Sequence, residues 1–265
     1  MDRRVAPDRH QSAAIDIRGA RKVFAAETGD VHALGPIDLT VAPGDFISLL
    51  GPSGCGKSTL MLMIAGLLPL TSGEIRIDGV PVSGPQIGVG IMFQDNTLVP
   101  WRSVRRNVEL QLELRGLPVV NFRSRIDQLI GAVKLDGFAD RMPFELSGGM
   151  QQRAAFCQAL VHEPATLLLD EPLGKLDAMT REAIRRDLQT LWLEKRPTVV
   201  FVTHSIEEAV QLSSRVCVVT PRPGRIERTF DIDLPYPRDL GIKRSSGFRD
   251  RVAQIEEIFH GYGVL

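Results

Sequence analysis

Short apolar runs recur along the chain, and several of them are apolar throughout rather than alternating with polar residues. Such continuous runs are typical of strands buried on both faces of a parallel sheet. The pattern predicts strands at residues 14–17, 37–41, 45–50, 74–79, 89–93, 165–170, 198–203 and 215–220.

Helical patterns lie between these runs and dominate the middle of the chain. Residues 56–68 are apolar on every side, which predicts a buried helix, and further helices are expected at 177–195 and 205–213. Strand signals fade from about 97 to 160, where residues 104–114 and 125–135 have helical spacing. We therefore expect an α/β fold with a mostly parallel sheet covered on both faces and an inserted α-helical subdomain.

The two ends of the chain lack the regular alternation of strand and helix patterns that the centre shows. Residues 1–13 are expected to form a solvated N-terminal tail. Residues 221–239 alternate but are broken by prolines, which favours edge strands and loops over a separate domain. The main domain then covers 14–240, and 241–265 is a C-terminal helical extension.

Charge and composition exclude some functions. The 265 residues carry 32 Lys and Arg against 32 Asp and Glu, so no overall field attracts the chain to nucleic acid, and we expect no such partner. The apolar run at 60–70 is shorter than the ~20 residues that span a bilayer. Cys55, Cys157 and Cys217 show no CxxC spacing, which predicts free thiols that serve packing.

Candidate chemistry begins with GPSGCGKST, which follows the apolar run 45–50 and opens a helix. It fits the phosphate-binding pattern GxxxxGK[ST], in which backbone N–H groups and a helix N-terminus hold phosphate oxygens. Lys57 would reach the β- and γ-phosphates, and the Ser58 hydroxyl would bind Mg²⁺. The predicted phosphate-binding residues are Gly51, Pro52, Ser53, Gly54, Cys55, Gly56, Lys57, Ser58 and Thr59.

Polar side chains at three other strand ends complete this site. Asp170 ends the buried run of LLLDEP and is expected to hold the magnesium ion, and Glu171 could activate an attacking water. Gln94 follows the run at 89–93 and could bind Mg²⁺ or that water. His204 follows TVVFVT, beside the expected position of the γ-phosphate.

A second glycine pair, in LSGGMQQR, begins another predicted helix at residues that include Ser147, Gly148 and Gly149. Together with the motifs above, it makes the chain resemble the ATP-binding subunits of ABC transporters from about residue 15 to 220. The resemblance implies a P-loop NTPase (RecA-like) core with an antiparallel β region, ATP and Mg²⁺ as cofactors, and two copies of the chain joined head to tail around two ATP molecules.

The same resemblance implies individual roles. Phe24 is similar to the aromatic that stacks on adenine, although it could instead be a core residue. Gln94 resembles the residue that links the nucleotide to the helical subdomain, Glu171 the general base, and His204 the residue that contacts the γ-phosphate. Asp177 resembles an aspartate at the interface of the two copies.

Ser147, Gly148 and Gly149 would face the γ-phosphate held by the second copy. Two positions depart from the family pattern: Met150 replaces a common Gln, and Lys175 stands where a small apolar residue is usual. We favour a solvent-facing Lys175 without effect on coupling.

The segments LVPW (98–101) and PRPGR (221–225) are similar to those of nitrate, sulfonate and taurine importers. This resemblance implies a peripheral subunit on the cytoplasmic face of the inner membrane. It would bind a separate permease near Gln94–Trp101 and act indirectly with an external solute-binding protein. Trp101 could dock the permease or only cap the helical subdomain. An ABC exporter or lipoprotein-extraction ATPase, a non-transport ABC protein, and a P-loop metabolite kinase are the alternatives.

Overall fold

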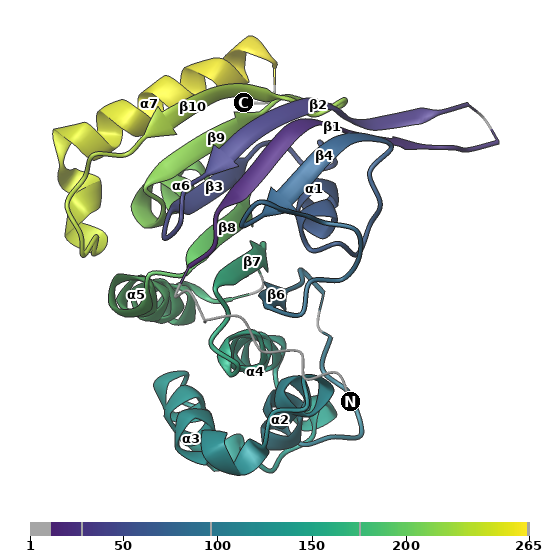
Figure 1. Ribbon diagram of the computed structural model, residues 1–265. Coiled ribbons are helices and arrows are strands. Elements are labelled where there is room, and N and C mark those ends of the chain that lie inside the picture. The colour runs from purple at the N-terminus through teal and green to yellow at the C-terminus, as the bar shows by residue number, and fades with distance from the viewer. Residues whose placement is uncertain (1–11, 28, 96, 175, 264–265) are drawn as a thin grey trace.

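The computed structural model describes residues 12–27, 29–95, 97–174 and 176–263, and their strands form two sheets. The smaller sheet is antiparallel and has the strand order β2-β1-β4-β5. In Figure 1 its two long strands extend as a hairpin beyond the rest of the molecule. Its strands are β1 Ile15–Phe24, β2 Val31–Val41, β4 Ser72–Ile77 and β5 Val80–Pro81.

The larger sheet has six strands in the order β10-β9-β3-β8-β7-β6. Neighbouring strands run parallel except for β10, which lies antiparallel at one edge. The expected fold class, with a mostly parallel sheet and an antiparallel region, is confirmed. The strands are β3 Phe46–Leu50, β6 Val89–Met92, β7 Thr166–Asp170, β8 Thr198–Thr203, β9 Arg215–Val219 and β10 Ile226–Asp231.

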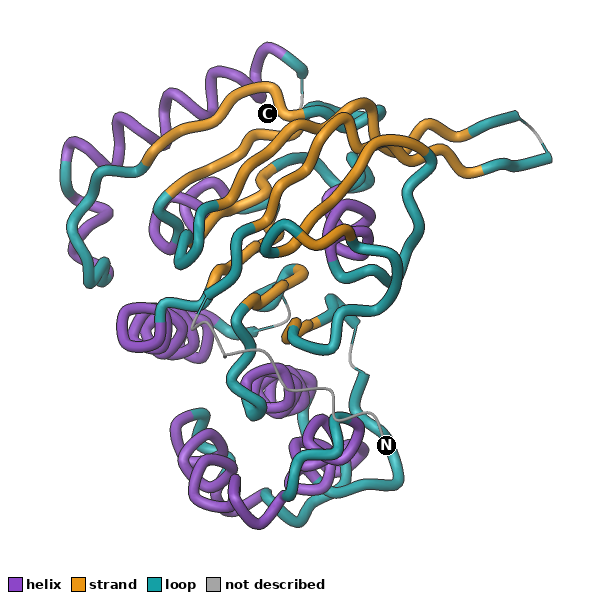
Figure 2. Tube along the Cα trace, viewed as in Figure 1, coloured by secondary structure: helices purple, strands orange, loops and turns teal. Residues whose placement is uncertain are grey.

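Helices cover the sheets, and further helices gather at the end of the molecule away from the antiparallel sheet, as Figure 2 shows. The α-helices are α1 Lys57–Ile64, α2 Val104–Leu114, α3 Arg123–Ala132, α4 Gly148–Leu160, α5 Ala178–Lys195, α6 Ile206–Leu212 and α7 Ser246–Gly261. Short 3-10 helices are η1 Val119–Phe122, η2 Asp136–Phe138, η3 Pro143–Glu145 and η4 Leu240–Arg244. Among the described residues, no helix combines the length and apolar character needed to cross a membrane.

The core lies on both faces of the larger sheet because its central strands β3, β7 and β8 are buried at every position and most of their side chains are apolar. Along β8, Val199 and Phe201 pack toward the helices α2 to α5, whereas Val200 and Val202 pack toward α1 and the antiparallel sheet. Helix α1 therefore lies between the two sheets. Residues of α6, α7, β9 and β10 form a third cluster.

Some element boundaries differ from the predicted ones. The helix expected at 56–68 ends at Ile64, since the chain turns at Gly66 with φ +71°, where a Cβ would lie 1.9 Å from the carbonyl oxygen of Gly84. The strand expected at 14–17 continues to Phe24, with register shifts against β2 that interrupt the alternation of apolar residues. The helix expected at 125–135 spans Arg123–Ala132.

Candidate functional site

The segment Gly51–Thr59 joins the end of β3 to the first turn of α1. Gly54 and Gly56 adopt φ values of +75° and +103°, a region that favours glycine. A Cβ at Gly56 would lie 2.6 Å from Leu34 Cδ2 and 2.8 Å from the carbonyl oxygen of Ala33. The glycines therefore let the loop bend tightly against β2 and enter the helix, the backbone shape that a phosphate cradle requires.

The side chain of Lys57 is buried inside this loop. Its Nζ donates to the carbonyl oxygens of Gly51 and Pro52, each at 2.8 Å.

Cys55, in the same loop, is also buried, and burial raises the pKa of its thiol. Burial likewise raises the pKa of Cys157 to about 12 and that of Cys217 to about 11. All three thiols are free and buried, as the sequence predicts, and their raised pKa values keep them neutral at ordinary pH.

Ser58 and Asp170 bring a hydroxyl and a carboxylate together at the head of α1. Ser58 Oγ donates to Asp170 Oδ1 at 3.0 Å. Burial raises the pKa of the Asp170 carboxyl, and the neighbouring charge of Glu171 raises it further. Oxygen donors of this kind suit Mg²⁺, and a cation here would offset the cost of burying the carboxylate. The residues thus fit the magnesium site that the sequence predicts.

Two polar side chains from separate strand ends, Gln94 and His204, contact the carboxylate of Glu171. Gln94 Nε2 donates to Glu171 Oε2 at 3.1 Å, and His204 Nδ1 lies 3.3 Å from Glu171 Oε1. Glu171 has φ 44°, a left-handed conformation that is uncommon for a residue other than glycine. Parallel strands end at the same edge of a sheet, so β6, β7 and β8 deliver these groups to one place.

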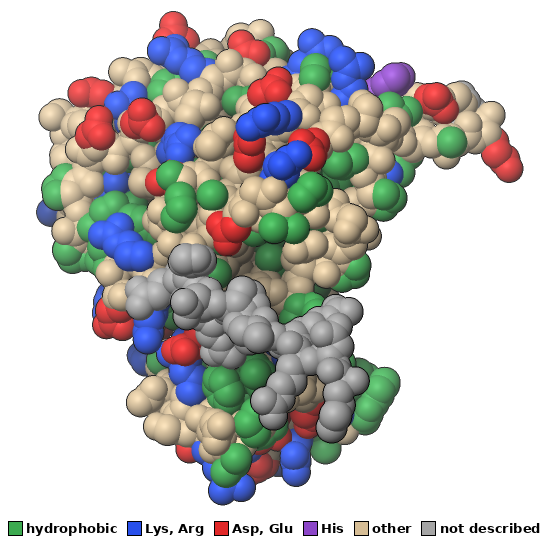
Figure 3. Space-filling view, in the orientation of Figure 1, with side chains coloured by type: hydrophobic (Ala, Val, Ile, Leu, Met, Phe, Trp, Pro, Cys, Tyr) green, Lys and Arg blue, Asp and Glu red, His purple; other side chains and the backbone are tan. Residues whose placement is uncertain are grey.

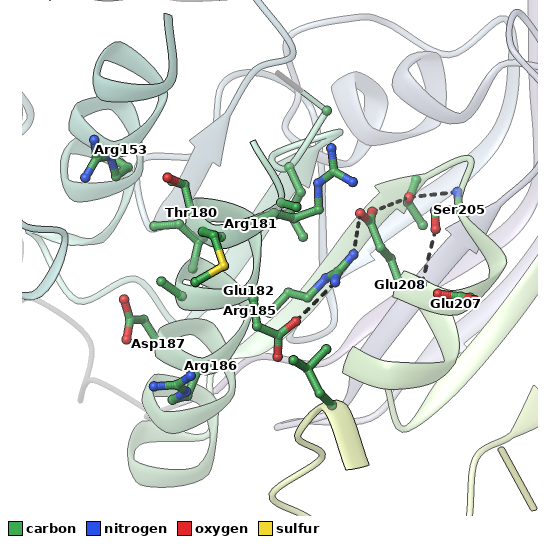
Figure 4. A pocket seen from close by; sticks show the side chains of 18 of the residues that line it. Arg153, Thr180, Arg181, Glu182, Arg185, Arg186, Asp187, Ser205, Glu207 and Glu208 are labelled. Atoms are coloured by element: carbon green, nitrogen blue, oxygen red, sulfur yellow. Dashed lines mark hydrogen bonds and ion pairs between the residues drawn. The ribbon is translucent and has the colours of Figure 1, made fainter. Parts of the chain in front are cut away.

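The two residues that flank His204 in the sequence, Thr203 and Ser205, belong to a hydrogen-bond network. Thr203 Oγ1 donates to Glu208 Oε2 at 3.0 Å and accepts from the Ser205 N–H at 3.0 Å. Arg185 in turn donates to Glu208 Oε1 at 2.8 Å. Figure 4 shows this network on one wall of a pocket of about 900 Å³. The lining of this pocket also includes Glu171 and His204.

A smaller pocket, of about 250 Å³, is lined by residues of the phosphate-binding loop together with Glu171 and Gln94. Phe24, Val31 and Ala33 also line it. Phe24 is 39% exposed, so the alternative that it is a core residue is wrong. Lys22 Nζ lies 5.0 Å from the centre of the Phe24 ring, a cation–π contact. Arg222, in the segment PRPGR, also lines this pocket, although the sequence analysis does not assign it to the nucleotide site.

The LSGGMQQR segment lies elsewhere on the same chain. Ser147 caps α4, where its Oγ accepts from the Met150 N–H at 3.3 Å, and Gly148 and Gly149 form the first turn. Ser147 and Gly148 are exposed, and none of the three lines the pocket beside Lys57. One chain thus does not bring its two glycine-rich motifs together. Met150 packs partly buried against the α-helical core.

Asp177 caps the N-terminus of α5 and accepts from the N–H groups of Met179 and Thr180 at 3.1 and 3.0 Å. Hydrogen bonds from the side chain and N–H of Thr180 lower the pKa of this exposed carboxyl. Lys175, for which we predicted a solvent-facing side chain, lies outside the described residues.

Trp101 projects from a loop that is held firmly from behind. Its side chain is 77% exposed, so the interpretation as a cap of the helical subdomain is wrong. Asn107 is fully buried and clamps the loop. Its Oδ1 accepts from the Val99 N–H at 2.7 Å, and its Nδ2 donates to the carbonyls of Val99, Arg102 and Ser103 at 2.8 to 3.1 Å.

Charges of both signs are interspersed over the face of the molecule that Figure 3 shows.

The site lies at the carboxyl edge of a parallel sheet, with a glycine-rich loop leading into a helix, which is the arrangement of a P-loop nucleoside triphosphatase. The protein is therefore of the class that hydrolyses ATP. A family model described as ABC transporter matches residues 34–174, and the chain belongs to the ABC transporter family.

Several similar proteins carry informative descriptions. An uncharacterised ABC transporter ATP-binding protein of Methanocaldococcus jannaschii is 43% identical over 91% of this chain and 90% of its own length. An aliphatic sulfonates import ATP-binding protein of Bacillus cereus is 39% identical over 95% of this chain and 98% of its own length. A solved ATP-binding cassette, described as a dimer in a post-hydrolysis state bound to ADP and Pi, aligns with a TM-score of 0.76 at 31% identity, over 83% of this chain and 100% of that one.

Proposed function

We propose that this chain is the ATP-hydrolysing subunit of an importer that takes up a small solute of the nitrate, sulfonate or taurine kind. The hydrolytic part rests on the meeting of Gln94, Glu171 and His204 beside the phosphate-binding loop. The import part rests on one observation: relatives described as sulfonate import proteins match over more than nine-tenths of both chains.

Hydrolysis in this proposal uses the side chains at the loop and at the strand ends. Lys57 and the loop N–H groups hold the β- and γ-phosphates, while Ser58 and Asp170 would hold Mg²⁺, whose charge would stabilise the transferred phosphoryl group. Glu171 is placed by Gln94 and accepts a proton from the attacking water. His204 contacts the γ-phosphate and Phe24 stacks on the adenine ring.

A second copy of the chain completes each site in the same proposal. Ser147 and Gly148 are exposed and lie outside the pocket that contains Lys57, so they are available to a phosphate held by another molecule. Gly149 begins the same helix, and Asp177 lies exposed at the start of α5. We infer that two chains pair head to tail around two ATP molecules and that closing of the pair drives the permease.

The permease binds near Gln94–Trp101 in this account, on the cytoplasmic face of the membrane. An exposed tryptophan is a frequent anchor at protein interfaces, and the Asn107 clamp reduces the entropy that the loop would lose on binding. The solute itself would be selected by the permease and by an external solute-binding protein.

Co-purification tests this assignment. The chain expressed with its candidate permease should form a complex from detergent extracts, and proteoliposomes with the solute-binding protein should take up sulfonate, taurine or nitrate only with ATP. Trp101→Ala should abolish complex formation and uptake but leave ATP binding by the isolated chain unchanged. Leu114→Ala is the matched control, because Leu114 is 71% exposed at the other end of α2. ATP-driven transport of the solute in the opposite direction, away from the side of the membrane that carries the ATP-binding subunit, would contradict import.

A further inference from the structure

The turn between β9 and β10 lies directly against the phosphate-binding loop. The Gly224 N–H donates to the carbonyl of Ala33 at 3.1 Å, and the Gly35 N–H donates to the carbonyl of Gly224 at 2.9 Å. A Cβ at Gly224 would lie 2.1 Å from the carbonyl oxygen of Cys55. Backbone contacts on two sides therefore fix the position of this turn, and with it that of Arg222.

Arg222 uses two of its nitrogen atoms on a single carbonyl of the phosphate-binding loop. Its Nε and Nη2 donate to the carbonyl oxygen of Gly54 at 3.2 and 3.1 Å. The N–H groups of such a loop must face the phosphates, and the carbonyls must then point away. A guanidinium that binds the Gly54 carbonyl holds this peptide in the orientation that the cradle requires.

Charge gives a second reason to connect Arg222 with the nucleotide. Lys57 and Arg222 are the two basic side chains among the described residues that line the pocket of about 250 Å³. A nucleoside triphosphate carries several negative charges, and charge-assisted hydrogen bonds are the strong ones in such sites. The Arg222 side chain is exposed and forms no ion pair in the described part of the chain.

We propose that Arg222 is a positioning residue of the nucleotide site, which holds the phosphate-binding loop through Gly54 and adds positive charge to the wall of the pocket. This inference rests on the proposed function of that loop. It predicts an effect on the binding of phosphates and none on the choice of base, because Arg222 contacts the loop backbone at Gly54.

Three variants test the inference: Arg222→Ala, Arg222→Lys, and Arg225→Ala as matched control. Arg225 lies on the same turn and is exposed, but it lines a different cavity together with Arg21 and His32. Arg222→Ala should weaken the binding of ATP and of ADP about tenfold, since hydrogen bonds to charged groups are worth enough for such a change. Arg222→Lys should recover part of the loss, and Arg225→Ala should bind like the wild type.

Isothermal titration and steady-state kinetics provide the measurements. In Arg222→Ala the KM for ATP should rise about tenfold, while kcat at saturating ATP and the preference for ATP over GTP stay within about twofold. The melting temperature without nucleotide should not change, since the side chain is exposed.

Wild-type affinity in Arg222→Ala would overturn the inference. So would a lower melting temperature without nucleotide that Arg222→Lys does not restore, because the role would then be structural. Lys57→Ala distinguishes a failure of the proposed site itself: if wild type and Lys57→Ala bind ATP equally well, the loop does not hold the phosphates.

Discussion

Replacing Arg238 with alanine tests how the C-terminal segment is attached to the core. Arg238 is 1% exposed, and its guanidinium donates five hydrogen bonds to four main-chain carbonyls. Nη1 reaches Val210 and Ser213 at 2.8 Å each, Nη2 reaches Ile232 and Leu234 at 2.8 and 2.9 Å, and Nε reaches Leu234 at 3.2 Å. One side chain thus joins α6 to the segment after β10.

The expected cost of this change follows from those contacts. Hydrogen bonds to a charged group are worth about 1.5–3 kcal/mol each, but they are not additive, and part is offset because the buried guanidinium has lost its hydration. Burial accordingly lowers the pKa of Arg238. Truncation leaves buried carbonyls without a donor, and breaking a buried charged network costs about 3–5 kcal/mol. That is a large part of the ~5–15 kcal/mol by which a folded domain is stable.

Urea unfolding measures this loss. Trp192 provides the fluorescence signal because its ring lies 4.9 Å from that of Tyr236, over which the Arg238 guanidinium stacks at 3.9 Å. Arg238→Ala should lower the free energy of unfolding by about 3–5 kcal/mol, and Arg238→Lys by less. Arg244→Ala, an exposed control on η4, should stay within about 0.5 kcal/mol. A loss below ~1 kcal/mol in Arg238→Ala would show that these hydrogen bonds do not hold the C-terminal segment on the core.

Three further variants test the site. Asp170→Asn should raise the melting temperature of the nucleotide-free chain at pH 7, because burial raises the pKa of Asp170 and the ionised carboxylate therefore disfavours the folded state. Calorimetry should find this gain lost below pH ~4, where the carboxyl group of the wild type is protonated in both the folded and the unfolded state. Gln94→Ala should leave the Kd for ATP unchanged and lower kcat at least ~10-fold, because it removes a donor that orients Glu171; an unchanged kcat would exclude this role. Ser147→Arg should bind ATP as wild type but not hydrolyse it; normal turnover would contradict the shared site.

The parts of the fold and site that the sequence predicts well depend on local patterns. The strand at Thr198–Thr203 and the helix at Val104–Leu114 were predicted with the observed limits, because an apolar run and a helical period are each contained within one element. The phosphate-binding loop and the strand-end residues Asp170 and His204 also follow from short motifs in a defined context.

What the sequence does not predict depends on contacts between distant segments. Arg222 binds Gly54 across 168 positions, and Arg238 reaches Val210 across 28 positions; no sequence pattern predicts either contact. The exposure of Phe24 and Trp101 depends on how neighbouring segments pack, so a pattern of residue types left two interpretations of each. The sequence predicts strands shorter than β1 and β2, because the register shifts between these two strands break the period of two.

In the proposed pair, the two glycine-rich motifs of one chain serve two different ATP molecules, so that a complete site needs two chains. Light scattering of Glu171→Gln with saturating ATP and Mg²⁺ tests it most directly, because this variant should bind ATP, fail to hydrolyse it and keep the pair closed. We expect twice the mass of one chain in the presence of ATP and the mass of a single chain in its absence. If the variant binds ATP and remains a single chain, the ATP site is not shared between two chains, and if it hydrolyses ATP at the wild-type rate, Glu171 is not the general base.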